Sequence, residues 1–469
     1  MWNIIGIGLC VFLGLVFLVG SLDDLFIDFC HMLGGLAPKF ISKEVWKEWR
    51  AIPEGPIAVM VPAWQEASVL ESMVRTNLSR IKYQNYRWFI GVYPNDLETL
   101  EIAKRVERDY PEKVTVVVTD RPGPTSKAHC LNCIVRVLAE LSMIAKKEGR
   151  GWVPYYVAIH DAEDIIHPYS FTAINAQSRS LDFIQLPIFS LPVPAKSWVA
   201  GTYLDEFSEI HLKEIPVREK LTMPIPSAGV GTFFSWKILS QLLYRFGYCF
   251  NENNLTEDYE ISQRIARLDG AQTFLLVRDE SGQIVATREY FPDSFGRSVR
   301  QKTRWTTGIA LQTLNEWGRF GRRLGRAQWL RNLAASYGLY RDRKSLWANP
   351  IAFLGWIFLV CSMIFRMELP KSHWIISLFM INLALFVIRL IQRARFTAQV
   401  YGAVHGVLSM PRVVYSNLIN GLASLQAIKN YSSARRGGNQ GKMAWTKTDH
   451  KFPDMKELNR LEGTYENQN

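Results

Sequence analysis

Hydrophobic positions in the middle of the chain form short runs that alternate with amphipathic stretches. Between Pro56 and Gly231, five apolar runs are bounded by Pro, Gly or Asp: IAVMVPAW, WFIGVYP, VTVVVTD, YYVAIHD and DFIQLPI. The segments that begin at Glu66, Leu97 and Ser126 instead carry apolar residues at helical spacing. Strands that alternate with helices are typical of βαβ units, so the pattern predicts a largely parallel sheet covered by helices.

Three longer stretches, residues 1–22, 345–365 and 372–388, contain no charged residue. Each has the length that a helix needs to cross a bilayer, about 17 to 25 residues. Basic residues flank them on one side: Lys39, Lys43, Lys47 and Arg50; Arg341, Arg343 and Lys344; Arg389, Arg393 and Arg395. No Lys or Arg precedes the first stretch and GSLDD is a poor cleavage site, so we expect an uncleaved anchor and not a signal peptide. Because basic flanks face the cytoplasm, we expect the N-terminus outside and the middle region and the tail inside.

The formal net charge of +12 is concentrated before the second of these stretches. Residues 297–344 contain twelve Lys or Arg against Glu316 and Asp342. This position next to a membrane span favours anionic lipid headgroups over nucleic acid as the partner. For Arg322, Arg323 and Arg326, a solvated basic face without any partner is the alternative.

The cysteine pattern does not indicate a disulfide framework. Six cysteines are scattered along the chain, and Cys10 and Cys361 lie inside apolar runs, which favours a reducing compartment. Cys130 and Cys133 form one CxxC motif, but zinc would need two further ligands and the sequence has no second pair. We interpret both as packing residues on a helix.

Acidic residues gather where a predicted strand ends. PNDLET, RPGPTSK and HDAED each follow such a strand, and ligands of parallel sheets bind beyond the carboxyl ends of the strands. We therefore expect these loops to share one crevice. HDAED supplies Asp161, Glu163 and Asp164, and clustered carboxylates suit Mg²⁺ or Mn²⁺ held together with substrate phosphates. The alternative is that these acids only face water or cap the next helix.

A second acidic cluster lies in NNLTEDYEISQRI. Thr256 is a candidate helix cap, which places Glu257 and Asp258 in the first turn. One of them would be a general base that deprotonates an acceptor hydroxyl, unless both only complement the helix dipole. The apolar face of the expected helix consists of Ile261, Ile265 and Leu268.

A third motif, QKTRW at residues 301–305, lies at the start of the basic segment. Gln301 and Arg304 offer hydrogen-bond donors and Trp305 an aromatic surface, which suit a phosphate and a sugar ring. A Trp beside an Arg near a membrane is also typical of an interfacial anchor.

Taken in order, VPAWQE, YPNDLET, SKAHCLN, HDAED, LTED and QKTRW resemble the processive members of glycosyltransferase family 2, such as cellulose, chitin and hyaluronan synthases. The longer stretches PGPTSKAHCLN, HDAEDIIHP, PSAGVGT and REYFPDSFGRSVRQKTRW are similar to the phage adsorption protein B (NfrB) family. That family consists of inner-membrane glycosyltransferases that supply an exopolysaccharide used as a phage receptor. The resemblance implies a GT-A-type (Rossmann-like) domain and an inverting transfer from a UDP-sugar.

The resemblance also assigns donor residues. Asn95 departs from the family pattern, because many relatives have a second Asp at this position, next to the one that Asp96 matches. Asp161 and Glu163 match the DxD metal ligands, with Asp164 as an alternative second ligand for Mg²⁺ or Mn²⁺. Pro62, Ala63 and Glu66 match the segment that lines the uracil pocket. Asp96 matches an acid near the base and ribose, and Lys127 matches the lysine beside the diphosphate.

On the acceptor side, Asp258 matches the catalytic base, with Glu257 as its support or alternative. Gly229 and Gly231, in PSAGVGT, would let the growing glycan approach the backbone. Matches to the QxxRW motif, which contacts the diphosphate and the acceptor sugar, are Gln301, Arg304 and Trp305. A substrate-covering loop is implied for Trp445, Lys447, Thr448 and His450, with an ordinary cytoplasmic tail as the alternative.

The expected organisation is an N-terminal anchor (1–30), a cytoplasmic catalytic domain (50–310), a basic juxtamembrane segment (311–344), two transmembrane helices (345–391), amphipathic interface helices (396–430) and a tail (431–469). We expect a multi-pass protein of the bacterial inner membrane. Three spans are few for a private glycan channel, so an outer-membrane export partner or self-association is expected to supply one. The resemblance implies an N-acetylhexosamine as the donor sugar of this polymerising enzyme. The alternatives are a transferase that adds a single sugar and a catalytically inactive membrane assembly factor.

Overall fold

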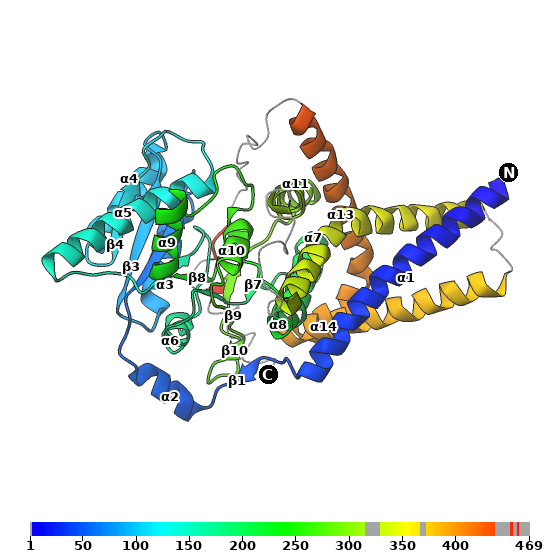
Figure 1. The fold of residues 1–469 in the computed structure, drawn as a ribbon, viewed down its shortest axis with the longest axis horizontal. Coiled ribbons are helices and arrows are strands. Elements are labelled where there is room, and N and C mark those ends of the chain that lie inside the picture. Colours follow the sequence, from blue (N-terminus) through cyan, green and yellow to red (C-terminus); the bar gives the residue numbers. More distant parts are fainter. Residues whose placement is uncertain (1, 315–328, 366–371, 437–450, 454–456, 459–469) are drawn as a thin grey trace. The chain divides into compact units, whose positions relative to one another are not determined.

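The structure is a computed structural model that describes residues 2–314, 329–365, 372–436, 451–453 and 457–458 (Figure 1). The chain forms two compact units, each built from separate stretches of sequence. The first unit contains Met1–Leu36, Pro192–Met223 and Phe291–Gln440. The second contains Ala37–Leu191, Pro224–Tyr290 and Gly441–Asn469. Part of the region 50–310 that we expected as one catalytic domain therefore belongs to the first unit.

The second unit is built around a seven-stranded sheet. Its strands, in spatial order, are β4 (Val114–Val118), β3 (Tyr86–Val92), β2 (Ile57–Pro62), β5 (Tyr156–Ile159), β8 (Thr232–Ser235), β6 (Phe183–Gln185) and β9 (Gln272–Phe274). The β2 strand pairs in parallel with β3 and β5, whereas β8 runs antiparallel to β5 and β6. The predicted largely parallel sheet is thus confirmed, and β8 is the exception that the pattern did not reveal.

The run DFIQLPI, predicted as one strand, is divided in the structure. The β6 strand ends at Gln185, and β7 (Ile188–Ser190) pairs instead with β11 (Thr287–Glu289) in a separate two-stranded sheet. Pro187 lies between them and has no backbone N–H to donate, which explains the interruption. A second two-stranded sheet joins β1 (Lys39–Phe40) to β10 (Val277–Arg278).

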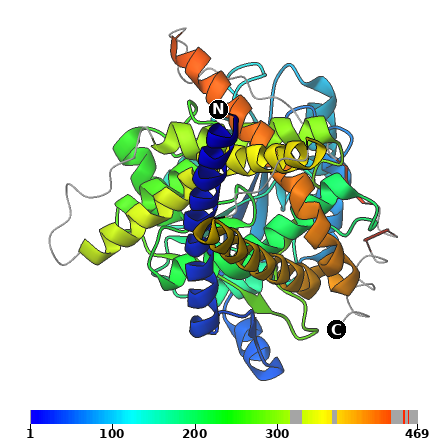
Figure 2. The ribbon, with the colours of Figure 1, turned by 90° about the vertical axis from the view of Figure 1, so that its right-hand side faces the viewer.

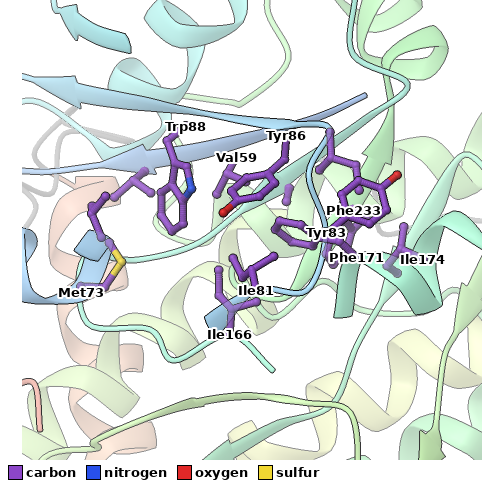
Figure 3. Close-up of a cluster of buried hydrophobic side chains, with 14 of the residues drawn as sticks. Val59, Met73, Ile81, Tyr83, Tyr86, Trp88, Ile166, Phe171, Ile174 and Phe233 are labelled. Carbon is purple, nitrogen blue, oxygen red and sulfur yellow. The ribbon is translucent and has the colours of Figure 1, made fainter. Parts of the chain in front are cut away.

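Helices of the second unit cover the sheet. They are α2 (Lys43–Ala51), α3 (Leu70–Arg80), α4 (Leu97–Asp109), α5 (Lys127–Glu148), α6 (Ser170–Asn175), α9 (Trp236–Phe246) and α10 (Glu257–Arg267). Figure 3 shows part of the core, in which Val59 and Trp88 of neighbouring strands lie with Met73 of α3 and Phe171 of α6. All four side chains are at most 1% exposed, so the parallel half of the sheet has a dry, close-packed face.

The α5 helix is long and apolar enough to cross a membrane, but it is a core helix. Its first half is buried, and a side chain at Gly91 of β3 would collide with the Sγ atom of Cys130. The apolar composition of α5 is therefore explained by its packing on the sheet.

The first unit consists of helices. They are α1 (Trp2–Gly34), α7 (Trp198–Glu209), the π-helical turn η1 (Ile210–Glu214), α8 (Ile215–Lys220), α11 (Phe295–Thr306), the π-helical turn η2 (Thr307–Thr313), α13 (Trp329–Ile364) and α14 (His373–Arg436). Only α1, α13 and α14 of this unit are long and apolar enough to span a membrane among the described residues. They overlap the three apolar stretches 1–22, 345–365 and 372–388, and each helix extends beyond its stretch.

These three helices pack on one another, as two directions of view show (Figures 1 and 2). The Nδ2 atom of Asn382 on α14 donates to the carbonyl of Gly14 on α1 at 3.0 Å. A side chain added at Gly355 of α13 would lie 2.9 Å from the ring of Phe17 on α1. Small residues thus let the helices approach closely, as is common between membrane helices.

The α14 helix bends at Gly402, whose φ of 81° and ψ of 170° are not helical. After the bend the helix continues through Pro411 to Arg436. Most of residues 396–430, expected as amphipathic interface helices, thus follow this bend, which falls at a residue that tolerates a positive φ.

Candidate active site

Two of the predicted site residues form a close ion pair in the second unit. The Nζ atom of Lys127, the first residue of α5, lies 2.5 Å from Oδ1 of Asp161. Asp161 follows β5, and Lys127 follows the loop after β4, so both lie beyond the carboxyl ends of parallel strands. This is the edge of the sheet at which the sequence predicted a crevice.

Lys127 also links the two acidic clusters. Burial alone would lower the pKa of this amine, but the carboxylates of Asp161, Glu257 and Asp258 raise it above its ordinary value. Nearby opposite charges favour the charged form of a buried amine. Asp161 of HDAED and the two acids of LTED, separated by about a hundred positions in the sequence, therefore act on the same ammonium group.

Asp258 lies against the loop PSAGVGT. Gly229 has a φ of +82°, and a Cβ atom there would lie 2.6 Å from Oδ2 of Asp258. Gly231 has a φ of +57°, and a Cβ atom there would lie 2.7 Å from Oγ1 of Thr287. Both glycines are thus required by backbone conformation and by space, and Gly229 leaves the room that the carboxylate of Asp258 occupies.

The helix that carries Glu257 and Asp258 begins as predicted, but its cap differs. Thr256 occupies the N-cap position of α10 without a side-chain cap bond; its Oγ1 atom instead donates to Oδ1 of Asn254 at 3.3 Å. The same Asn254 oxygen accepts from the backbone N–H of Thr256 at 2.9 Å. Asn254 therefore fixes the turn that presents the two acids.

The three acids of HDAED lie in different environments. Asp161 keeps 30% of its side chain exposed, whereas Glu163 and Asp164 are buried. Oδ2 of Asp164 accepts from the backbone N–H of Asp161 at 3.1 Å and lies 2.8 Å from Nδ1 of His160. Burial and the neighbouring carboxylate of Glu289 raise the pKa of Asp164 well above its ordinary value.

His160 is buried beside this carboxyl. Burial lowers the pKa of its imidazole to about 3, so His160 is neutral at physiological pH. The buried carboxyl of Asp164 therefore holds the backbone of the loop HDAED through its contacts with His160 and with the N–H of Asp161. Asp161 is then the acid of this loop that remains accessible to a ligand.

The predicted base and ribose contacts gather where β2 and β3 end. Pro62 is the last residue of β2, and Ala63 follows it. Asp96 is the N-cap of α4: Oδ1 accepts from the N–H of Thr99, and Oδ2 accepts from the N–H of Gln65 at 2.5 Å. Gln65 has a φ of 56°, so Asp96 fixes this unusual backbone, and Glu66 follows it with its side chain buried.

The sequence analysis missed the contacts that hold the neighbouring loop. Oδ1 of Asn95 accepts from the N–H of Gly123, and Nδ2 of Asn95 donates to its carbonyl, both at 2.7 Å. The ring of Trp64 lies where a side chain at Gly123 would be. Tyr93 forms a hydrogen bond of 2.7 Å with Oγ1 of Thr125. Asn95 and Gly123 are both typical turn residues that the sequence shows, but their pairing is a tertiary contact that the sequence does not reveal.

Gln301, Arg304 and Trp305 lie on α11, in the first unit. Trp305 is edge-on to Tyr203 at 6.2 Å between ring centroids, and Tyr203 stacks on Phe291 at 4.8 Å. Lys302, which lies between Gln301 and Arg304 in the sequence, is buried, and its Nζ atom lies 2.5 Å from the carboxylate of Glu206 on α7. The QxxRW helix is thus held by aromatic packing and by one buried ion pair.

The residues of the implied covering loop, Trp445, Lys447, Thr448 and His450, lie outside the described residues. The described tail that follows belongs to the second unit: Phe452 packs against the core, and Leu458 packs with Ile165 and Leu191.

Comparisons with known proteins identify relatives of the chain. The family model described as "Glycosyltransferase like family 2" matches residues 53–308. Bacteriophage adsorption protein B of Escherichia coli (strain K12) is 32% identical over 486 residues, which cover 95% of this chain and 62% of that protein. Bacteriophage N4 adsorption protein B of Escherichia coli O157:H7 matches with the same identity and coverage. The chain therefore spans about 62% of the length of these curated relatives.

Among solved structures, the mannosyltransferase PcManGT from Pyrobaculum calidifontis, in complex with GDP-Man and Mn²⁺, has a similar fold. The TM-score is 0.50 and the sequence identity 15%, and the match covers 89% of this chain and 99% of that one. This comparison supports the GT-A-type architecture expected from the sequence.

Proposed function

The chain belongs to glycosyltransferase-like family 2, and from this premise we propose that it is a membrane-bound, inverting glycosyltransferase that polymerises a UDP-activated sugar. The observation that carries the proposal is the ion pair between Lys127 and Asp161, together with the effect of Glu257 and Asp258 on the pKa of the same amine. A transferase of this kind needs one carboxylate for the cation on the donor diphosphate and another for the acceptor proton within one site, and these residues would supply both.

The donor nucleotide would bind at the ends of β2 and β3. Pro62, Ala63 and Glu66 would line the base, and Asp96 would hold the turn that presents them. Lys127 would contact the diphosphate, where its positive charge assists departure of the leaving group. In the absence of a donor this charge is paired with Asp161, so donor binding would exchange one anionic partner for another.

A divalent cation fits Asp161, although the protein offers no complete cage there. Among the described residues, the acids of HDAED do not form a compact group of three ligand atoms, and only Asp161 of the three is substantially exposed. Mg²⁺ and Mn²⁺ are commonly held by one or two carboxylates together with substrate phosphates. Asp161 would hold the ion with Glu163 behind it, and Asp164 would orient the loop. The bound ion would neutralise charge on the diphosphate.

Asp258 would act as the general base. Its carboxylate would take the proton of an acceptor hydroxyl while that oxygen forms a bond to the anomeric carbon of the donor sugar. The bond from the anomeric carbon to the diphosphate breaks, and UDP leaves with the electron pair. Attack from the face opposite the leaving group inverts the anomeric centre, so an α-linked donor gives a β-linked product. Glu257 would support the charge distribution around Lys127.

The acceptor glycan would approach near Gly229, whose missing side chain leaves room for the carboxylate of Asp258, and near Gly231 of the same loop. Gln301, Arg304 and Trp305 of the QxxRW motif would contribute contacts to the diphosphate and the acceptor sugar. This motif supports a processive reaction. The implied covering loop, Trp445 to His450, is part of the same proposal and lies outside the described residues.

The long apolar helices support placement in a membrane. Asp23 and Asp24 of α1 form ion pairs with Arg341 and Lys344 of α13 and with Arg389 of α14. These charges lie at the ends of the three apolar stretches, and they mark the level at which the bundle would leave the bilayer. By the basic-flank rule this level is cytoplasmic.

The similarity to bacteriophage adsorption protein B supports an exopolysaccharide product that serves as a phage receptor at the cell surface. The chain would then work in the bacterial inner membrane. An outer-membrane export partner or self-association would supply the passage for the glycan, and an N-acetylhexosamine is the first donor to test.

The test is a screen of UDP-sugars with membranes that contain the protein, measuring UDP release and product length. We expect UDP release that requires Mg²⁺ or Mn²⁺ for one UDP-sugar, together with a product of many sugars. UDP release with a product extended by a single sugar would favour the single-addition alternative. No UDP release from any donor, with folded protein and metal present, would contradict the proposal.

A further inference from the structure

Three metal-ligating side chains meet outside the proposed active site. Nε2 of His129 lies 2.9 Å from Oδ1 of Asp120 and 3.7 Å from Sγ of Cys133. The distance between Oδ1 of Asp120 and Sγ of Cys133 is 3.9 Å. It is the one group of three such ligands found among the described residues. One nitrogen, one sulfur and one oxygen therefore face a common point.

The spacing of these atoms matches a tetrahedral zinc site. With bonds of about 2.0–2.1 Å to nitrogen and oxygen and about 2.3 Å to sulfur, the edges of a tetrahedron are about 3.4–3.6 Å long. The three observed distances lie within about half an ångström of that range. His129 and Cys133 are four residues apart on α5, so they project from the same face of one helix.

The surroundings resemble the outer shell of a metal site. Oε1 of Glu252 lies 3.2 Å from Nδ1 of His129, and a carboxylate on the second ring nitrogen is what orients most metal-bound histidines. Nη2 of Arg136 lies 3.0 Å from Sγ of Cys133 and 3.0 Å from Oδ2 of Asp120, where it would stabilise the thiolate and the carboxylate.

One neighbour has to move for a metal to bind. Nη2 of Arg121 lies 2.6 Å from Nδ1 of His129 and 2.8 Å from Oε2 of Glu252. A histidine that binds a metal through Nε2 carries its proton on Nδ1, so Arg121 would turn away and keep its contact with Glu252. The Arg121 side chain is 56% exposed, which leaves it room to do so.

We propose that Asp120, His129 and Cys133 bind a thiophilic divalent cation, Zn²⁺ in the first place, with water in the fourth position. The thiol of Cys133 loses its proton to solvent when the metal–sulfur bond forms. Asp120 is exposed and gives the ion a path of entry, whereas His129 and Cys133 are buried. The site goes beyond the proposed function, because the cation for the donor diphosphate belongs to the oxygen ligands at Asp161.

The bound ion would connect three segments of the second unit. Asp120 lies in the loop between β4 and α5, His129 and Cys133 lie on α5, and Glu252 precedes the turn that presents Asp258. Zn²⁺ would therefore restrain the loop that leads to Lys127, and it should raise the melting temperature of the protein.

The full-length protein in detergent is titrated with Co²⁺ in excess Mg²⁺, which occupies oxygen-ligand sites. Thiolate bound to Co²⁺ gives a charge-transfer absorption that oxygen ligands do not give. We expect one equivalent of this absorption in the wild type, its displacement by Zn²⁺, and its loss in Cys133→Ala and His129→Gln. Cys130→Ala is the matched control, because Cys130 is on the same helix but faces Gly91 of β3.

Melting curves without metal establish that each variant is folded. The proposal is supported when Cys130→Ala keeps both the absorption and the rise in melting temperature on addition of Zn²⁺, while the folded Cys133→Ala and His129→Gln variants lose both. It is overturned when the wild type shows no thiolate absorption, or when Cys130→Ala and Cys133→Ala bind Co²⁺ alike. Because none of these readouts uses catalysis, failure of this site would not bear on the proposed transferase activity.

Discussion

Gly229 shows how a single residue determines the room available to the proposed base. Its φ is +82°, and a Cβ atom would lie 2.6 Å from Oδ2 of Asp258. We predict that Gly229→Ala lowers kcat by about 10²-fold, the loss expected when a reacting group is displaced by about 1 Å. UDP release at saturating donor measures it.

The control is Gly247→Ala. Gly247 has a φ of +77°, but nothing lies within 4 Å of a Cβ atom built on it. This substitution imposes the same kind of backbone strain without touching Asp258. Equal loss of kcat in the two variants would show that strain, and not displacement of the carboxylate, causes the effect.

Asp164 and Asp161 should respond differently to substitution. The buried carboxyl of Asp164 contacts His160 and the N–H of Asp161, and an Asn oxygen can accept from both. We predict that Asp164→Asn remains folded and keeps most of its activity, whereas Asp164→Ala leaves a buried donor unsatisfied and destabilises the protein by about 1–3 kcal/mol. If Asp164→Asn abolished metal-dependent activity as completely as Asp161→Asn, Asp164 would be a metal ligand.

The same substitution changes the pH dependence of stability. Because burial raises the pKa of Asp164 in the folded state, the stability that comes from its neutral form is present at low pH and declines as the pH rises through the folded-state pKa. Asn does not titrate. The melting temperature of Asp164→Asn should therefore fall less than that of the wild type as the pH rises from the ordinary pKa of an aspartate towards the raised pKa of Asp164.

Some of the site could be predicted at this scale and some could not. Lys127 and Asp161 belong to loops at strand ends, and that position indicated a shared crevice, whereas Asp258 was assigned to the site by the resemblance to the family. The contacts of Asn95 with Gly123, and of Asn254 with Thr256, depend on side-chain geometry that spacing does not contain. Cys133 was interpreted as a packing residue because the sequence has no second CxxC pair, and its approach to Asp120 is a tertiary contact that spacing does not reveal.

At the scale of elements, α7 carries a row of buried acids that bind neighbouring helices of the first unit. Asp205 pairs with Arg412 of α14 at 2.7 Å, Glu206 with Lys302 of α11, and Glu209 with Arg393 of α14 at 2.9 Å. These acids belong to the stretch DEFSE. They join α7 to α14 and to α11, the helix that carries the QxxRW motif.

We predict that Arg412→Met destabilises the protein by about 3–5 kcal/mol, because it leaves the buried carboxylate of Asp205 without its charge partner. Asp205 and Arg412 are each about 1% exposed. Thermal melting of the detergent-solubilised protein measures the change. The double variant Asp205→Leu with Arg412→Met should recover much of the loss, and Arg436→Met, at an exposed position of the same helix, should have little effect. Equal melting of all three variants would contradict the importance of this pair.

The periodicity of the sequence predicted the parallel strands and the three long apolar helices, because each is a local pattern with one consistent environment. It did not predict that β8 runs antiparallel, since strand direction is set by connections through the other unit and not by the residues TFFS. The apolar length of α5 also shows that composition alone does not separate a core helix from a membrane span.

In the molecule as a whole, three separate stretches of the chain form the first, helical unit. The charges of Asp23, Asp24, Arg341, Lys344 and Arg389 would lie together at the cytoplasmic face. We predict that a reporter fused after residue 469 lies in the cytoplasm, where green fluorescent protein is fluorescent and alkaline phosphatase is inactive. A fusion that ends after Phe365 should give the reverse result. Active phosphatase at the C-terminus would contradict this topology.

In the proposed mechanism, Asp161 and Asp258 serve one site, the first for the donor and its cation and the second for the acceptor proton. The most direct measurement compares UDP binding and turnover in Asp161→Asn and Asp258→Asn, with Mg²⁺ or Mn²⁺ present. We predict that Asp258→Asn binds UDP nearly as the wild type does while turnover falls by about 10²–10⁴-fold, the usual contribution of a general base. Asp161→Asn should lose metal-dependent UDP binding. Near-normal turnover in Asp258→Asn, or unchanged metal-dependent binding in Asp161→Asn, would contradict the claim.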